Sequence, residues 1–506
     1  MGWNLLLLLS VFCLLNRSAF GGVARKKHER RLVGLPGGTA ANAALPPDQW
    51  LIQRLDHSDP TNPGTWWQRY QTNDAWFKNA RNSPVFLMIG GEGEASAEWL
   101  VNGAAWTIYA QKFGALCFQL EHRFYGESQP RSDLSVESLK FLSSEQALAD
   151  IAYFIQSMNE KYRLSANNRW VVFGGSYSGS LAAWARLKYP HLVHAAVSTS
   201  GPLLAEANFK SYDEVVKRAL AASSPKCAAN VHKAALAVED LLKTPHGPSV
   251  LSKKFNLCTE LDVSNKKDVS NFAESLAGNF QGVVQYNRDN RMADPKPPSV
   301  DDLCKLMTDG DEPKLIDRYA AVNRLLTNGT CLDVKYHSYI EEMRSESYDV
   351  TAGGRPWLYQ TCTEFGFYQT SSSRNEIFGS LFNLQFFIDQ CKDIFDQSFD
   401  QNRLNDGIRR SNNNYGALGI AVSNVVFVQG SLDPWHVLGV TKSTNPSAPA
   451  ILIDGTAHCA NMYPPGPGRP SAADGGEGQN RTDPRRMVEL GRTMDSLQWH
   501  CSALKL

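Results

Sequence analysis

The sequence predicts an α/β fold in which a mostly parallel sheet is interrupted by a long helical insertion. Short apolar runs rich in Val, Ile, Leu and Phe alternate with helical patterns from about residue 84, which is typical of parallel sheets. The expected strands are residues 84–90, 115–121, 170–174, 194–198, 425–428 and 450–453. Because the last two stand far along the chain from the first four, we expect the sheet domain to be split in sequence.

Two kinds of helix complete this prediction. Between the second and third strands lies a capped amphipathic helix, with Ser143 at its N-cap and Gln146 placed to close a capping box, so these strands form a βαβ crossover. After about residue 205 the strand pattern gives way to long helical stretches. They are residues 215–222, 231–242, 269–284, 315–326 and 334–343. We interpret this region as a mostly helical insertion.

The N-terminus predicts entry into the secretory pathway. An apolar run from Leu5 to Leu15 has the length of a signal peptide and ends well short of the roughly 20 residues that span a bilayer. We expect residues 1–22 to be a signal peptide, and residues 23–32 to be either a brief propeptide or a basic, solvated tail. No later segment has the length and apolarity of a transmembrane helix, so the mature chain is expected to be soluble.

Composition and cysteine spacing narrow the class further. Lys plus Arg and Asp plus Glu are balanced at 51 each, so no net field favours nucleic acid or an acidic membrane. Apart from Cys13 in the signal, the cysteines lack the close pairs of zinc sites, so we expect disulfides. Their odd number leaves at least one thiol free, for which Cys117 in an apolar strand is the candidate. Sequons at Asn328 and Asn480 predict glycosylation.

The sharpest local pattern is residues 171–184, where an apolar strand runs through a tight Gly/Ser turn into a helix. This is typical of a nucleophile elbow, in which a strained turn lifts a serine Oγ above the sheet. Ser176 is the expected nucleophile, and the crowded turn requires small residues at Gly174 and Ser178. The alternative is an ordinary strand-to-helix turn with a serine N-cap. Ser178 and Ser180 are weaker candidates because they would lie on the first helical turn.

A serine nucleophile needs a base, and the base needs an acid that fixes its tautomer. In the α/β-hydrolase fold the order is Ser, Asp or Glu, His. Asp433 follows the expected strand 425–428, and His458 follows the expected strand 450–453. Singly, Asp433 also fits a turn-forming Asp-Pro pair and His458 a loop histidine, but in this order behind an elbow they predict a triad. His436 is the main competing base, although it follows the same strand as Asp433.

The loop after the first strand predicts the rest of the catalytic centre. The oxyanion hole is expected to use the backbone N–H of Tyr177 and a second N–H from the glycine-rich residues 90–94, for which Gly91 is the best candidate. Glu92 in the same loop either faces the cleft and holds a charged substrate group or is a solvated carboxylate.

Seven segments together resemble the lysosomal-type serine peptidase family that contains prolyl carboxypeptidase and dipeptidyl peptidase II (serine carboxypeptidase S28), and most closely its thymus-specific branch. They are residues 53–57, 67–70, 121–126, 174–178, 357–366, 431–436 and 455–459. The resemblance implies an α/β-hydrolase fold with a large, mostly helical inserted cap and a triad of Ser176, Asp433 and His458. Family members usually follow the histidine's cysteine with a short acidic motif, where this chain has Ala460-Asn461-Met462.

The resemblance also sets the functional expectations. We expect hydrolase parts at 33–204 and 406–506, a cap at 205–405, substrate-binding roles for Glu92, Glu364 and Trp435, and no metal or organic cofactor. The implied activity is exopeptidase-like cleavage, in many members after proline, in the endosomal or lysosomal pathway or after secretion. Peptides or proteins are the expected partners, without nucleic acid or membrane, and homodimerisation is left open. The alternatives are a lipase or esterase on the same scaffold, or an inactive luminal binding protein.

Overall fold

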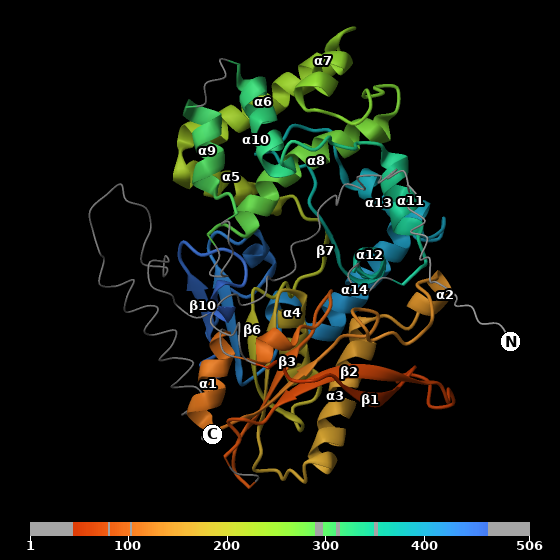
Figure 1. Ribbon diagram of the computed structural model, residues 1–506, viewed down its shortest axis with the longest axis vertical. Helices are drawn as coiled ribbons and strands as arrows, with labels where there is room; N and C mark the ends of the chain where they lie inside the picture. The colour runs from red at the N-terminus through yellow and green to blue at the C-terminus, as the bar shows by residue number, and fades with distance from the viewer. Residues whose placement is uncertain are drawn as a thin grey trace, which may run out of the picture.

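A computed structural model describes residues 44–78, 81–101, 104–288, 297–309, 314–348 and 353–463. The expected signal peptide, the basic segment 23–32 and Asn480 lie outside these residues. One unit is built on an eight-stranded sheet, and a helical cap stands over it (Figure 1). The strand order in the sheet is β1-β2-β4-β3-β5-β6-β9-β10. The architecture is that of an α/β-hydrolase.

The six predicted strands are all present, and their ends lie within two residues of the prediction. They are β3 (Val85–Ile89), β4 (Leu116–Leu120), β5 (Trp170–Gly175), β6 (Val193–Thr199), β9 (Val425–Gly430) and β10 (Ala450–Ile453). All six pair in parallel. Strands β9 and β10 join the sheet beside β6, which confirms that the sheet is split in sequence.

Two further strands, β1 (Gln49–Arg54) and β2 (Thr65–Asn73), extend the sheet as an antiparallel hairpin. These two strands were not predicted because they are only partly buried and carry polar residues, whereas the six predicted strands are continuous apolar runs. The hairpin leaves Trp50, Ile52 and Trp67 exposed on one face.

The sheet has a separate apolar core on each face. Along β3, Val85, Leu87 and Ile89 pack into the core shared with helices α3 (Ser144–Lys161) and α4 (Tyr177–Lys188). The alternate residues Phe86 and Met88 pack into a smaller core with helix α1 (Ala105–Phe113) and the short helix η1 (Ala97–Leu100). Because strand side chains alternate between faces, a continuous apolar strand requires cover on both sides.

The N-terminus of α3 differs in one detail from the capping box. The Ser143 hydroxyl accepts the Gln146 backbone N–H at 3.2 Å, as predicted. The Gln146 side chain, however, turns away from Ser143: its Oε1 accepts the His57 N–H at 2.9 Å and its Nε2 donates to Asp56 at 2.6 Å. It therefore joins α3 to the segment after β1 instead of closing the box.

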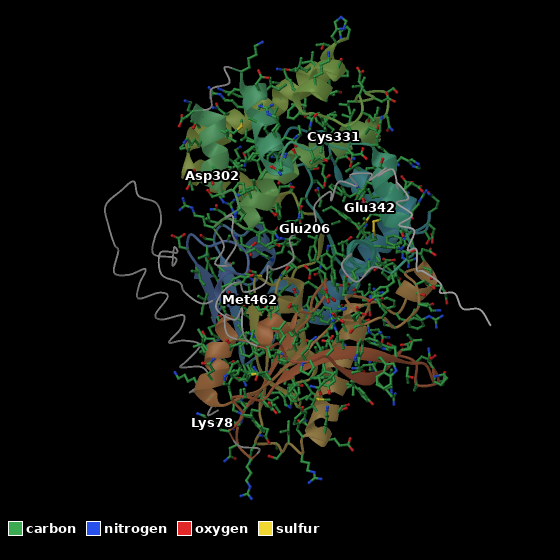
Figure 2. All side chains as sticks on the ribbon, viewed as in Figure 1. Lys78, Glu206, Asp302, Cys331, Glu342 and Met462 are labelled. Carbon is green, nitrogen blue, oxygen red and sulfur yellow. A yellow bond between two sulfur atoms is a disulfide. The ribbon has the colours of Figure 1, made fainter. Side chains whose placement is uncertain are left out.

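The chain between β6 and β9 is mostly helical. The cap, by which we mean helices α5 to α13, comprises α5 (Ser211–Ser223), α6 (Pro225–Leu242), α7 (Gly247–Lys254), α8 (Lys266–Gln285), α9 (Val300–Asp309), α10 (Leu315–Thr327), α11 (Tyr336–Arg344), α12 (Gly354–Gln360) and α13 (Leu384–Ile394). Figure 2 shows Asp302 and Cys331 within this cap, Lys78 and Met462 in the sheet unit, and Glu206 between the two. Glu206 belongs to β7 (Glu206–Asn208), which pairs with β8 (Gly366–Tyr368) where the chain enters the cap.

The remaining helical elements connect the cap with the sheet unit. A π-helical turn, η2 (Thr361–Phe365), follows α12, and α14 (Gln401–Tyr415) and η3 (Ala417–Gly419) precede β9. In the sheet unit, α2 (Val136–Leu139) precedes α3, η4 (Pro434–Leu438) follows β9, and η5 (Ala460–Met462) follows β10.

Among residues 44–463, as far as the structure describes them, three disulfides stabilise the helical region, as the cysteine spacing predicted. They join Cys227 to Cys304, Cys258 to Cys331, and Cys362 to Cys391. Cys117 is a free, buried thiol, which confirms the prediction, and Cys459 is a second one. Within the described residues, no helix is long and apolar enough to cross a membrane.

Candidate active site

Ser176 lies at the turn between β5 and α4 in a strained backbone conformation. Its φ is 60° and its ψ is −132°, which L-residues rarely adopt and which carries a strain of roughly 1–3 kcal/mol. The Ser176 N–H donates to the Thr199 carbonyl of β6 at 3.0 Å, which ties the turn to the neighbouring strand. This is the geometry of the predicted elbow, and an ordinary N-cap residue has an extended conformation instead.

The residues around Ser176 fit tightly. A Cβ on Gly174 would lie 2.0 Å from the Ser178 carbonyl oxygen, so only glycine fits there. The Ser178 hydroxyl donates to the Gly175 carbonyl at 2.7 Å and accepts the Gly175 N–H at 3.1 Å, so serine braces the turn at the position where glycine is usual. The Ser180 hydroxyl donates to Pro202 O at 2.8 Å. Both alternative serines are thus held by backbone groups, which favours Ser176 as the nucleophile.

Asp433 and His458 form a buried pair beyond the carboxyl ends of β9 and β10. The Nδ1 atom of His458 lies 2.8 Å from Oδ2 of Asp433, and neither side chain is exposed to solvent. The other carboxylate oxygen of Asp433 accepts the Trp435 backbone N–H at 2.9 Å. Asp433 therefore has both oxygens engaged, one by its own loop and one by the imidazole.

The competing histidine occupies a different position. Nδ1 of His436 lies 2.6 Å from the backbone carbonyl of Asp433, so His436 contacts the peptide group and not the carboxylate. A triad requires the acid to bond the base through its side chain. The geometry therefore selects His458 over His436.

The imidazole of His458, the predicted base, is coupled electrostatically to Asp433. Burial lowers its pKa, but the charge and hydrogen bond of Asp433 outweigh burial and raise the pKa well above 6.5. Within the described residues Nε2 of His458 is buried without a hydrogen-bond partner. This nitrogen is the one a triad uses toward its serine, and that contact is commonly long in enzymes without substrate.

The loop that carries His458 packs directly against the turn between β5 and α4. The Cys459 N–H donates to the Ser200 hydroxyl at 3.0 Å, and Ser200 is the first residue after β6. A Cβ on Gly175 would lie 3.1 Å from the Cys459 sulfur and 2.2 Å from the Met462 sulfur. The residues adjoining Ser176 and His458 are thus in contact, and the loops after β5, β6, β9 and β10 meet at one edge of the sheet.

The loop after β3 lies against the start of α4. A Cβ on Gly91 would be 3.8 Å from the Ser178 backbone nitrogen, which places this loop beside the first N–H groups of the helix. Such groups have no acceptor within their own helix and are suited to bind an anion. Gly91 therefore lies beside the N-terminus of the helix that begins at Tyr177, and the oxyanion hole stays a prediction.

Two buried charges hold this loop in place. Glu121 accepts the Ala95 N–H at 2.9 Å and pairs with Arg69 at 2.6 Å. Arg69 also donates to the Ala95 carbonyl at 3.2 Å and to Glu94 at 3.1 Å. The end of the loop is thus bound through both its backbone and a side chain.

The phenol of Tyr177 is hydrogen-bonded from both the sheet unit and the cap. Its hydroxyl lies 3.2 Å from Nε2 of His122, after β4, and 2.9 Å from Nε2 of Gln360 in α12. Burial lowers the pKa of His122 to about 4, so His122 is neutral. Gln360 also accepts the Tyr125 hydroxyl at 2.7 Å. These bonds fix the residue whose backbone follows the nucleophile.

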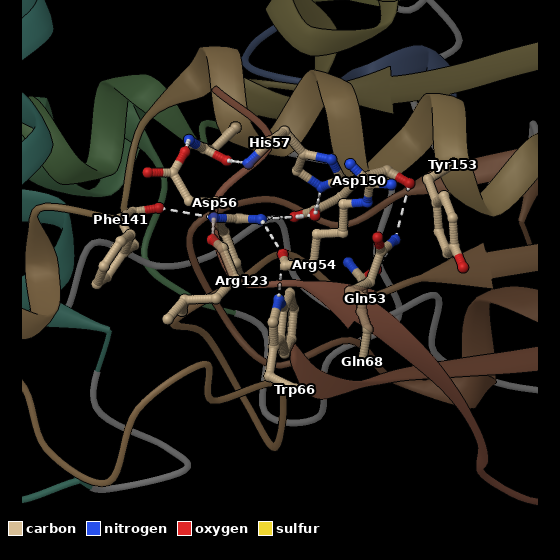
Figure 3. Close-up of polar contacts among 12 residues, drawn as sticks. Gln53, Arg54, Asp56, His57, Trp66, Gln68, Arg123, Phe141, Asp150 and Tyr153 are labelled. Carbon is tan, nitrogen blue, oxygen red and sulfur yellow. Dashed lines mark hydrogen bonds and ion pairs between the residues drawn. The ribbon is translucent and has the colours of Figure 1, made fainter. Parts of the chain in front are cut away.

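A larger polar network braces the segment that carries His122 (Figure 3). Arg123, which is fully buried, makes two bonds of 2.6 Å to Asp150 of α3 and donates to the Phe141 carbonyl at 2.8 Å. His57 completes the network with a 2.7 Å contact to Asp150. Burial raises the pKa of the Asp150 carboxyl, but the charge of Arg123 outweighs burial and leaves that pKa below its usual range.

The three predicted substrate-binding residues occupy different places. Trp435 packs beside the triad, with its ring centroid 6.5 Å from that of His458. Glu92 is half-buried where its loop meets the N-terminus of α12, since a Cβ on Gly353 would lie 2.5 Å from the Glu92 carbonyl oxygen.

Glu364 lies apart from both. It is buried behind the elbow and accepts the backbone N–H and the hydroxyl of Ser144 at 3.1 and 2.8 Å, so it caps helix α3. Its two oxygens accept hydrogen bonds from Ser144 and Gln360, and a substrate-binding role for Glu364 stays a prediction.

Other residues at the site carried no signal in the sequence. Gln285 of α8 and Gln360 of α12 are cap residues that contact the catalytic loops, but a helical glutamine alone predicts nothing. Gln360 lies within residues 357–366, one of the segments that carry the family resemblance, and the sequence gives no other indication of its role. No cluster of three metal-ligating side chains occurs in the part of the chain that the structure describes.

Comparison with known proteins identifies the family. The model of the family described as serine carboxypeptidase S28 matches residues 53–472. The chain belongs to the serine carboxypeptidase S28 family. It is accordingly a serine-type peptidase, and the match includes the three residues of the predicted triad.

Relatives within the S28 family cover most of the chain. Thymus-specific serine protease of Mus musculus is 37% identical over 434 residues, covering 83% of this chain and 83% of the relative. The Homo sapiens protein of the same name is 35% identical, covering 86% and 85%. Lysosomal Pro-X carboxypeptidase of Homo sapiens is 30% identical, covering 81% and 82%.

Proposed function

We propose that the protein hydrolyses peptide bonds through a triad of Ser176, His458 and Asp433 and an acyl-enzyme intermediate. The observation that carries the proposal is the buried 2.8 Å pair between Asp433 and His458, whose loop lies against Gly175, the residue before the strained Ser176. A buried base oriented by an acid next to an elbow is what serine activation requires.

The reaction follows from these positions. Ser176 Oγ attacks the peptide carbonyl while His458 Nε2 takes the hydroxyl proton, and the imidazolium is stabilised by Asp433. The carbonyl oxygen becomes an oxyanion that the N–H groups of Tyr177 and Gly91 receive. The C–N bond then breaks as His458 returns the proton to the leaving amine. Water, activated by the same histidine, releases the second product and restores the serine.

The cap supports action on chain ends or short peptides. Tyr286, the C-cap residue of α8, lies with its ring 5.9 Å from the His458 ring, so cap residues reach the catalytic base itself. Cap residues this close to the predicted base favour an extended peptide segment over a folded domain as substrate. Cleavage after proline is an additional part of the proposal, supported by the name of the Pro-X carboxypeptidase relatives.

The disulfides and the lysosomal relatives support a route through the secretory pathway. We propose an endosomal or lysosomal site of action within it. Asn328, at the exposed left-handed C-cap of α10, is a surface position at which glycosylation remains a prediction.

A peptide-library digest read by mass spectrometry tests the substrate class. The mature protein and its Ser176→Ala variant are incubated with peptides of mixed sequence, with free and blocked ends, and with lipid esters. We expect cleavage next to free ends, enriched after proline, that Ser176→Ala abolishes. Hydrolysis of lipid esters alone, or efficient internal cleavage of a folded protein, would contradict the proposal.

A further inference from the structure

The C-terminal end of α8 meets both catalytic loops at one residue. The backbone carbonyl of Gln285 accepts the His458 backbone N–H at 2.9 Å. The side-chain oxygen of Gln285 accepts the Trp435 indole N–H at 3.0 Å and the Tyr212 hydroxyl at 2.6 Å. One cap residue therefore bonds the loop of the base through its main chain and the loop of the acid through its side chain.

Trp435 transmits this contact to Asp433. Its backbone N–H donates to Asp433 Oδ1 at 2.9 Å, while its indole donates to Gln285. Its ring is enclosed by the rings of Phe209 and Phe367, each at 5.3 Å between centroids. A shift of the indole would move the backbone group that orients the catalytic carboxylate.

The location at a helix end has an electrostatic consequence. The last carbonyls of a helix have no partner within it and carry the negative end of the helix dipole. Gln285 is the final residue of α8, and its carbonyl is aimed at the His458 backbone. The helix end thus lies where positive charge develops on the imidazole when His458 takes the serine proton.

We propose that Gln285 is a positioning residue that couples the seating of the cap to the alignment of the Asp433–His458 pair. This inference rests on the proposed function and adds to it that the cap completes the catalytic machinery as well as limiting access. The titratable groups that face His458 are Asp433 from the acid loop, Cys459 from its own loop and Tyr286 from α8.

The test compares four variants of the full-length mature protein. Gln285→Ala removes the side-chain acceptor, Trp435→Phe removes its donor, and the double variant removes both. Gln281→Ala is the matched control, because Gln281 lies one turn earlier in α8 and bonds Asp213 at 2.8 Å within the cap. Steady-state kinetics on a cleaved peptide and the rate of fluorophosphonate labelling are measured for each, and circular dichroism confirms folding.

We expect Gln285→Ala and Trp435→Phe each to lower kcat and the labelling rate roughly tenfold or more, with KM changed less than about twofold, because misplacing a base by about 1 Å costs up to 10²-fold. Since both remove the same bond, the double variant should be little worse than either single variant. Gln281→Ala should retain kcat. Wild-type kcat and labelling in Gln285→Ala would overturn the inference while leaving the proposed function intact.

A charge substitution gives a second readout that a merely structural role would not move. Gln285→Glu keeps an oxygen acceptor for Trp435 and Tyr212 and adds a negative charge near the imidazole. We expect the acid limb of the pH–kcat profile to be displaced to higher pH, since the charge stabilises the imidazolium. An undisplaced limb would contradict the inference. Failure of the wild type to label at Ser176 would instead refute the proposed function.

Discussion

Asp433 bonds two histidines in this structure, but only one of them through its carboxylate. Oδ2 lies 2.8 Å from Nδ1 of His458, whereas His436, three residues further along the loop, meets only the Asp433 carbonyl at 2.6 Å. The acid and base of the proposed triad therefore come from loops after different strands, β9 and β10. This separation makes the roles of the two histidines distinguishable by experiment.

Removing the charge of the acid should disable the base without disturbing the fold. In Asp433→Asn the amide keeps an oxygen for the Trp435 N–H but presents an NH₂ group to Nδ1 of His458, which forces the wrong tautomer. We expect kcat to fall about 10³- to 10⁴-fold. Peptide turnover at pH 7 checks this, with the melting temperature as a control. A loss below tenfold would show that Asp433 is not the acid.

The two histidines should respond differently to substitution. His458→Ala removes the base, so we expect both turnover and fluorophosphonate labelling to fall by about 10³-fold or more. His436→Ala removes only a contact to a backbone carbonyl, so we expect less than about a tenfold loss. Parallel labelling time courses of the two variants check the assignment, and the opposite ranking would assign the base to His436.

The position of the loop that carries Gly91, and with it kcat, should depend on the buried ion pair between Glu121 and Arg69. Glu121→Gln weakens the bonds to Arg69 and to the Ala95 N–H, so the loop that presents the oxyanion donor loses its anchor. Removing one oxyanion donor outright costs about 10²–10³ in kcat, so loosening it should cost roughly tenfold. Peptide kinetics measure this fall, with KM nearly unchanged.

The matched control for this prediction is Glu137→Gln, which breaks the exposed pair between Glu137 and Lys140. Exposed pairs contribute about 0–1 kcal/mol, so activity should be retained. Equal losses in both variants would argue against a specific role for the Glu121 anchor.

The stability of the cap should increase at acid pH. Asp213 of α5 is buried, and within the described residues its Oδ2 has no hydrogen-bond partner. Burial and the nearby carboxylate of Glu376 raise the pKa of Asp213 well above 3.8. A group whose pKa is raised on folding contributes stability that is present below its unfolded pKa and lost as the pH rises through its folded pKa.

Thermal unfolding at pH 5 and pH 7 checks this prediction. The wild type should melt at a higher temperature at pH 5, and Asp213→Asn, which cannot ionise, should reduce the difference between the two pH values. Asp240→Asn, an exposed substitution on α6, serves as the control and should leave the difference unchanged. A pH dependence identical in Asp213→Asn and the wild type would exclude Asp213 as its source.

The sheet and the tight turn at Ser176 could be predicted because their signals are local. A strand buried on both faces needs a continuous apolar run, and an elbow needs small residues around a serine, as Gly174 and Ser178 show. The hairpin β1–β2 was not predicted because one of its faces is exposed, so its strands lack a continuous apolar run. The Gln146 side chain also departed from expectation, since a bond to the His57 backbone competed with the local capping box.

The contacts between the cap and the catalytic loops could not be predicted from the sequence. Gln285 and Gln360 acquire their roles only when helices distant along the chain dock on the sheet unit, and glutamine occurs in helices for many reasons. The contact of Glu364 with the first residue of α3 also depends on distant segments meeting in the fold, so the sequence carried no indication of it.

The most direct test of the account is covalent labelling of the nucleophile. The mature protein is treated with a fluorophosphonate probe between pH 5 and pH 7, digested, and analysed by mass spectrometry to locate the adduct. The account predicts a single adduct on Ser176, which is lost in Ser176→Ala and strongly slowed in His458→Ala. No labelling of the wild type, or an adduct on Ser178 or Ser180, would contradict it.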